Sequence, residues 1–193
     1  MTRKETILQA ATVYFSKNGY FETSMSELSK NTGVAESTIF YHFKSKENLF
    51  LAILERVKDH IIKEFDGYIR EVEFHNGLEM VEAAVSFYLY LAGKMENEFL
   101  LLHRRYPYQL AEINPVCREN LEAIYNCLVD IFEKGVLKGQ QDGSIGEMPP
   151  RKVALIIFSM VDGITRFKTY NLYDASALFS ELIESCRKIL KKS

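Results

Sequence analysis

The sequence has few cysteines: Cys117, Cys127 and Cys186 are the three in 193 residues. Their number is odd and no two of them are closely spaced, so neither a disulfide framework nor a cysteine-based metal site is expected. The pattern favours buried thiols in a reducing compartment, with a redox sensor as the alternative. We therefore expect no metal and no cofactor.

The sequence also lacks the motifs of common enzyme classes. It contains no HExxH pair, no glycine-rich phosphate loop and no GxSxG nucleophile elbow. The four histidines are scattered at His42, His60, His75 and His103. No catalytic residue is expected, and a helical enzyme or a helical adaptor is kept only as an alternative.

Long hydrophobic runs are missing as well. The most apolar window, residues 83–92, is too short to cross a bilayer. The first residues are polar and precede an amphipathic stretch, which is unlike a secretory signal peptide. We expect a cytoplasmic protein with no membrane partner.

The charge is nearly balanced, with 24 Lys and Arg against 26 Asp and Glu. The first fifty residues hold six basic and five acidic side chains, so a broadly basic surface is excluded there. Any binding to a polyanion must then depend on a few well-placed cations, such as Lys44 and Lys46, and on more than one copy of the chain. The hydrophobic share, 47%, is enough for a sizeable core.

Apolar residues recur at helical spacing and no segment alternates with the period of a strand. The longest pattern runs from Lys46 to about Phe74, and residues 78–94 are apolar nearly all round, which is typical of a buried helix. Further helices are expected near residues 103–105, ended by Pro107, and over residues 115–137, 151–170 and 175–190. The sequence predicts an all-α protein of about nine helices.

The run from Gly33 to Leu49 carries the most informative pattern. At about 100° per residue, Ser37 and Tyr41 share one helical face, whereas Ile39 and Phe43 share a roughly opposite one. The helix therefore has a polar side and an apolar anchoring side.

A second short helix precedes it. Ser24 and Glu27 have the spacing of a capping box that opens a helix through about Asn31, and Thr32 and Gly33 then supply a tight turn. Two short helices joined by a glycine-containing turn form a helix-turn-helix, whose second helix lies in the major groove of DNA.

The stretch ILQAATVYFSKNGYFETSMSELSKNTGVAESTIFYHFKSKENL resembles the N-terminal domain of TetR-type transcriptional regulators, over about residues 3–50. The resemblance implies a helix-turn-helix domain over residues 1–46. A long helix would join it to a larger helical effector-binding and dimerisation domain over residues 47–193. The sequence departs from the family at Phe40, where many members have tyrosine, and at Ala35, where a capping serine is frequent.

Nine residues are candidates for contacts with DNA because they lie on or beside the presumed reading helix or at a helix start. They are Thr23, Ser24, Glu36, Ser37, Thr38, Phe40, Tyr41, His42 and Lys46. Lys46 is expected to bind a phosphate. Glu36 either complements the helix dipole or accepts from a cytosine amino group.

The aromatic-rich middle of the chain is the candidate effector site. Its members are Phe87, Tyr88, Tyr90, Phe99, His103, Arg104, Tyr106 and Tyr125. Such sites are mostly apolar with a few placed polar groups, and the neighbouring His103, Arg104 and Arg105 suit a fatty or aromatic acid. The same residues are equally compatible with plain core and a solvated face.

The resemblance implies that the last two helices form a homodimer interface. The residues expected there are Ile157, Val161, Ile164, Phe179, Leu182 and Cys186. The sequence is thus interpreted as a ligand-responsive transcriptional repressor. A small hydrophobic or amphipathic molecule is expected to release it from double-stranded, pseudo-palindromic operator DNA. An activator or a redox-responsive regulator of the same fold is the alternative.

Overall fold

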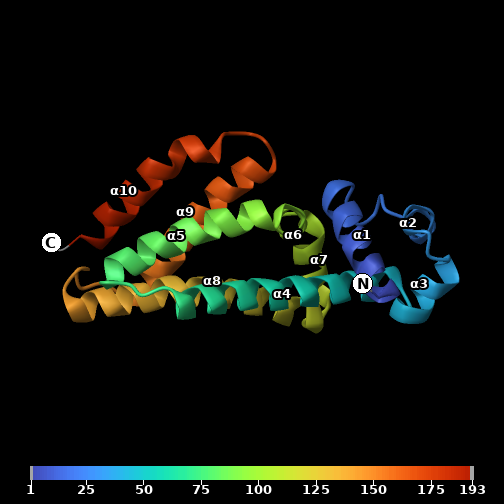
Figure 1. The fold of residues 1–193 in the computed structure, drawn as a ribbon, viewed down its shortest axis with the longest axis horizontal. Helices are drawn as coiled ribbons and strands as arrows, with labels where there is room; N and C mark the ends of the chain where they lie inside the picture. The colour runs from blue at the N-terminus through green and yellow to red at the C-terminus, as the bar shows by residue number, and fades with distance from the viewer. Residues whose placement is uncertain (1, 192–193) are drawn as a thin grey trace. The chain divides into compact units, whose positions relative to one another are not determined.

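The computed structural model describes residues 2–191, apart from the side chains of residues 175 and 176. This part of the chain forms ten α-helices and one short 3-10 helix and contains no strand (Figure 1). The α-helices are α1 (Arg3–Lys17), α2 (Met25–Thr32), α3 (Glu36–Phe43), α4 (Lys46–Glu71), α5 (Gly77–Lys94), α6 (Glu96–Leu102), α7 (Arg105–Ile113), α8 (Pro115–Asp142), α9 (Pro150–Thr169) and α10 (Phe179–Leu190), and the 3-10 helix η1 spans Ala175–Leu178. The expected all-α fold is confirmed.

The chain divides into two compact units. Unit 1 runs to Ile62 and also includes residues 96–124, and unit 2 comprises residues 63–95 and the chain from Tyr125 onward. The long helices α4 and α8 contribute residues to both units. The functional division expected after residue 46 remains a prediction.

Unit 1 is built around α1. Thr2 and Glu5 form a reciprocal capping box at its start, which stabilises the helix by satisfying free amide groups. Its apolar side, with Ile7 and Phe15 buried, packs against α2, α3 and α6. Phe50 of α4 contacts the Phe15 ring at a centroid distance of 6.0 Å.

Unit 2 contains a close backbone contact between α5 and α8. A Cβ atom placed on Gly77 would lie 2.0 Å from the Gly139 nitrogen, so no residue with a side chain fits at position 77. The backbone N–H of Gly77 donates to Asp142 Oδ2 at 2.8 Å, which satisfies a free amide at the start of α5. The start of α5 and the end of α8 are thereby fastened together.

Three expectations about single helices are wrong in detail. Helix α5 is not buried all round, because Ser86 and Tyr90 are exposed. The break after α6 falls at His103 and Arg104, and Pro107 lies inside the first turn of α7, where a missing N–H costs nothing. The last α-helix begins at Phe179, after a 3-10 turn. Within the described residues, no helix combines the length and the apolar character that a membrane crossing requires.

Candidate functional site

Helices α2 and α3 form a helix-turn-helix in unit 1. The backbone N–H of Glu27 donates to Ser24 Oγ at 3.0 Å, which caps α2. At the other end of α2, Gly33 adopts φ 67° in the left-handed region, the usual conformation for ending a helix and one that glycine adopts without strain. The turn expected at Thr32 and Gly33 is confirmed.

Helix α3 has the two faces that its periodicity predicts. Ile39 and Phe43 are buried and anchor the helix, whereas Tyr41 is 73% exposed. Ala35, at the start of α3, provides no side-chain cap. The first amide groups of α3 therefore keep their positive partial charge free for an anion, and Glu36 is the acidic side chain beside them.

Most of the residues predicted to contact DNA lie at the surface, but Thr23 does not. The exposed ones are Ser24, Glu36, Ser37, Phe40, Tyr41 and His42, and Thr38 is half-buried. Thr23 is fully buried, and its hydroxyl donates to the Gly19 carbonyl at 2.9 Å. Its side chain shapes the turn before α2 and is not available to DNA in this conformation.

Lys46 is turned toward its own domain. Its ammonium donates to the Phe21 carbonyl at 3.4 Å and lies 4.4 Å from the centre of the Tyr20 ring. Desolvation at this half-buried position lowers the pKa of Lys46. The structure thus gives Lys46 a positioning role beside any contact with phosphate.

Lys44 is the exposed cation that follows α3. It has φ 63°, and its ammonium lies 5.4 Å from the centre of the Tyr41 ring. The sequence placed Lys44 among the basic residues near the motif but did not select it as a site residue. Its surface position next to Tyr41 makes it a better candidate than Lys46 for binding a phosphate.

The predicted effector residues divide between the two units. In unit 1, Phe99 and His103 are buried. Arg104 donates from Nε to the Ser16 carbonyl at 2.7 Å and also donates to the Lys17 carbonyl. Arg104 therefore caps the end of α1, and no anionic ligand is needed to explain its position.

In unit 2, two predicted effector residues pack inside the unit, Tyr88 fully buried and Tyr125 half-buried. Tyr88 is buried and its hydroxyl donates to Asp162 Oδ1 at 2.6 Å. Tyr125 packs against Phe158 with ring centroids 5.8 Å apart. Both side chains are explained by packing within the unit.

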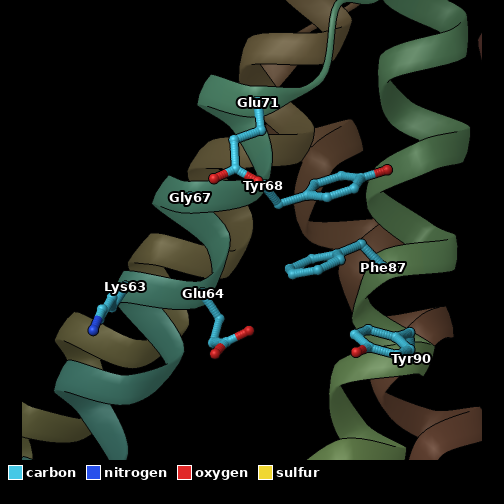
Figure 2. Close-up of a pocket in the computed structure, with 7 residues that line it drawn as sticks. All are labelled: Lys63, Glu64, Gly67, Tyr68, Glu71, Phe87 and Tyr90. Atoms are coloured by element: carbon cyan, nitrogen blue, oxygen red, sulfur yellow. The ribbon is translucent and has the colours of Figure 1, made fainter.

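The two others, Phe87 and Tyr90, line a cavity between α4 and α5 (Figure 2). Its volume is about 330 Å³, which lies at the lower end of the range of ligand sites. The lining residues are Lys63, Glu64, Gly67, Tyr68, Glu71, Phe87 and Tyr90.

The sequence interpretation missed the α4 side of this cavity. Glu64, Gly67, Tyr68 and Glu71 recur at spacings of three, four and seven residues and so share one face of the helix. Gly67 was noticed only as a possible bend. A glycine between two acidic residues, within an otherwise regular apolar stripe, is the signal that could have pointed to the site.

The predicted dimer residues are mostly inside unit 2. Ile157, Val161, Leu182 and Cys186 are buried, Ile164 is half-buried and Phe179 is exposed. The large apolar residues that α9 exposes are Leu155, Ile156 and Phe167. Leu155 and Ile156 are sequence neighbours of the buried Ile157. These two line an open hollow of about 380 Å³ together with Ser159 and Met160. A partner would therefore meet the neighbours of the predicted residues.

The three cysteines are free thiols. Burial raises the pKa of Cys117, Cys127 and Cys186 from 9.0 to about 11. The thiolate is the reactive form of cysteine, so this environment disfavours redox chemistry. No group of acidic, histidine or cysteine side chains suited to a metal ion occurs among the described residues.

Comparison with known proteins places the N-terminal domain in a family. Residues 7–53 match the model of bacterial regulatory proteins of the tetR family. The chain is 46% identical over 54 residues to the HTH-type transcriptional regulator QacR of Staphylococcus aureus. The aligned segment covers 28% of this chain and 29% of that protein. It is 24% identical to the fatty acid metabolism regulator protein of Bacillus subtilis, over 92% of this chain and 90% of that protein.

The fold agrees over nearly the whole length. The crystal structure of the transcriptional regulator FadR from Bacillus subtilis in complex with stearoyl-CoA superposes with a TM-score of 0.76 at 23% identity, covering 97% of this chain and 99% of that one. The matched segment contains α2 and α3, whose geometry is that of a helix-turn-helix. The N-terminal domain of this chain therefore belongs to the tetR family of bacterial regulatory proteins, and the protein is a DNA-binding transcriptional regulator.

Proposed function

We propose that the protein is a repressor that binds a pseudo-palindromic operator as a homodimer and leaves it when a small molecule binds unit 2. The proposal rests on the two faces of α3. Ile39 and Phe43 are buried and fix the helix, and Tyr41 projects from its exposed face. A helix anchored in this way can enter a major groove without rearranging its own domain.

Contacts with DNA divide into positioning and reading. The free amides at the starts of α2 and α3, beside Ser24 and Ala35, suit backbone phosphates. Tyr41 and Ser37 are exposed hydroxyl donors for base edges or phosphates. Lys44 supplies a cation at the same surface. This small number of charges fits the nearly balanced composition.

The cavity between α4 and α5 is the proposed effector site. Helix α4 begins at Lys46, three residues after the end of α3, and contributes Gly67 and Tyr68 to the cavity. A ligand changes DNA binding only if it binds one conformation of the protein better than another. The shared helix is the proposed path between site and DNA. The stearoyl-CoA bound to the Bacillus subtilis regulator supports a small-molecule effector with an apolar part.

A twofold dimer is part of the proposal because two recognition helices about 34 Å apart read successive turns of DNA. The exposed Leu155 and Ile156 on α9, and Phe179 on α10, offer apolar surface for a second copy. Dimerisation would double the few contacts that each domain makes. Such a regulator works on chromosomal DNA, so a cytoplasmic location is proposed with it.

The decisive experiment is selection of duplexes from a random library with the purified full-length protein. We expect enrichment of a sequence with twofold symmetry and half-sites centred about one or two helical turns apart. The double variant Ser37→Ala/Tyr41→Ala should lose the enriched sequence, whereas Gln141→Ala, on the exposed end of α8, should keep it. Failure of the native protein to enrich any sequence would refute the proposal.

A further inference from the structure

The rings of Tyr68, Phe87 and Tyr90 form one side of the cavity between α4 and α5, and we call them the aromatic wall (Figure 2). Tyr68 and Phe87 stack with centroids 4.0 Å apart and planes 6° from parallel. The Tyr68 hydroxyl donates to the Ala83 carbonyl at 3.4 Å, and the buried Phe65 supports Phe87 edge-on at 4.9 Å. Tyr68 and Phe87 are therefore held in place before any ligand arrives, and Tyr90 is the exposed member of the wall.

Two carboxylates face the wall from α4. Glu64 and Glu71 both line the cavity and lie two helical turns apart. In Figure 2 the Glu64 carboxylate extends toward the rings of Phe87 and Tyr90, and the Glu71 carboxylate lies beside Gly67 and Tyr68. The amino group of Lys63 extends away from that space in the same view. The charge that reaches the cavity from α4 is therefore negative.

Lys94 forms an ion pair with one of these carboxylates. Its ammonium lies 2.7 Å from Glu64 Oε2. The Lys94 side chain is 42% exposed. A ligand can displace it, since exposed ion pairs contribute little stability. An occupant with a positive charge would take over the role of Lys94, and Glu71 would supply further negative charge.

From this geometry we infer that the cavity binds an organic cation, with an ammonium group beside the carboxylates and an apolar or aromatic body against the aromatic wall. The inference rests on the proposed function, in which this cavity is the effector site. It replaces the fatty or aromatic acid expected from His103 and Arg104, because Arg104 is bound to the end of α1.

The chemistry of the wall favours a cation for a second reason. Aromatic faces carry negative electrostatic potential and attract ammonium groups within about 6 Å of the ring centre. An anion in the cavity would meet the carboxylates of Glu64 and Glu71 and the negative potential of the aromatic wall. A volume of about 330 Å³ admits a single substituted ammonium ion of moderate size.

Gly67 makes the floor of the cavity and offers a clean way to fill it. Nothing lies within 4 Å of a Cβ atom placed there, so a larger residue would project into free space. Replacing a helical glycine also removes its conformational cost, about 1 kcal/mol relative to alanine. Gly67→Leu should therefore fill the site while leaving unit 2 folded, and Gly67→Ala is the milder version.

The test uses calorimetric titration of the full-length protein with three probes of similar shape. These are phenyltrimethylammonium, the neutral isostere tert-butylbenzene and the anion benzenesulfonate. We expect the cation to bind at least about tenfold more tightly than either of the others. Equal binding of the cation and its neutral isostere, or tighter binding of the anion, would overturn the inference.

Variants then test where the probe binds and whether negative charge at the cavity strengthens its binding. Glu71→Gln should lower the affinity for the cation about five- to tenfold. Asp66→Asn, on the opposite side of α4, makes the same change in charge and should leave this affinity unchanged. Lys94→Met should strengthen cation binding by removing an ammonium that competes for Glu64. Gly67→Leu should abolish binding without lowering the melting temperature. A weaker cation affinity in Lys94→Met, or equal effects of the Glu71 and Asp66 variants, would contradict the assignment.

Failure of the inference and failure of the proposed function can be told apart. Binding of the probes is measured without DNA, and release of the selected duplex is measured separately. Cation binding without release of DNA would support the ligand class and contradict the induction model. If benzenesulfonate released DNA from the native protein but not from Gly67→Leu, induction through this cavity would be supported and the inference of a cationic ligand would be refuted.

Discussion

The rings of Tyr20 and Tyr106 stack 3.7 Å apart with their planes only 8° from parallel. Tyr20 follows α1 and Tyr106 lies in the first turn of α7, so the stack joins segments that are far apart in the sequence. Burial raises the pKa of the Tyr106 hydroxyl, which stays protonated at physiological pH. Arg104 reinforces the same junction through the carbonyls that end α1. Two residues predicted as ligand contacts, Arg104 and Tyr106, thus help to hold unit 1 together in this structure, and their role in ligand binding stays a prediction.

The first prediction concerns Arg104. Arg104→Ala removes two charge-assisted hydrogen bonds to the last carbonyls of α1 and should lower the free energy of unfolding by about 1–2 kcal/mol. Arg104→Lys should recover part of the loss. Thermal unfolding by calorimetry measures both. An unchanged melting temperature in Arg104→Ala would show that the cap contributes nothing.

Lys46 gives the second prediction, which separates positioning from phosphate binding. Lys46→Met keeps the aliphatic stem and removes the charge over the Tyr20 ring, so stability should fall by about 0.5–1 kcal/mol. Because the ammonium faces its own domain, the salt dependence of DNA binding should change little. A fall of about 0.9 in the salt slope would instead indicate a lost phosphate contact. Lys44→Met is expected to show that fall.

The third prediction uses the two faces of α3. Tyr41→Ala should weaken binding to the selected operator by about 1–3 kcal/mol and leave stability within about 0.5 kcal/mol of the native protein. Ile39→Ala, on the buried face, should lower stability by about 2–4 kcal/mol. Fluorescence anisotropy with labelled duplex and denaturant unfolding measure the two quantities. Normal operator affinity in Tyr41→Ala would remove this side chain from the interface.

Neighbouring residues on α9 provide the fourth prediction. Ile156 is 52% exposed and Ile157 is fully buried. Ile156→Glu should convert the dimer to a folded monomer, because a charge at an apolar contact is desolvated without a partner. Ile157→Glu should unfold unit 2. Sedimentation and circular dichroism distinguish the results, and a dimer that survives Ile156→Glu would move the interface elsewhere.

The cysteines give the fifth prediction. A thiol with its pKa raised from 9.0 to about 11 holds about a hundredfold less thiolate at pH 7 than an ordinary one. Alkylation by iodoacetamide should therefore be slow at pH 7 and accelerate as the pH rises toward 11. Cys127, which is half-buried, should react first. Rapid labelling at pH 7 would restore the redox-responsive alternative.

The helix-turn-helix could be predicted because its signals are local. Ser24, Gly33 and the alternation of Ile39 with Tyr41 each act within a few residues, and a short window of sequence contains the whole pattern. The orientation of Thr23 and Lys46 was not predictable in this way. Both side chains find partners in the loop around Gly19 to Phe21, and that loop's path depends on the packing of the whole domain.

The effector site was only partly predictable for a related reason. A contiguous aromatic cluster suggested one pocket, yet its members belong to two units. Phe87 and Tyr90 were identified, but Glu64 and Glu71 come from another helix that the sequence showed only as a lever. The face of α4 that packs against α5 is determined by tertiary packing and cannot be derived from the composition of the chain.

The close approach of Gly77 to Gly139 also bears on how the site can diverge among proteins of this fold. No side chain fits at that contact, so substitutions on that part of α5 are excluded by packing. On α4, by contrast, position 67 borders free space, and positions 64 and 71 line the same cavity. A lineage could therefore acquire a new effector by altering one face of a single helix, while the rest of the unit conserves its stability.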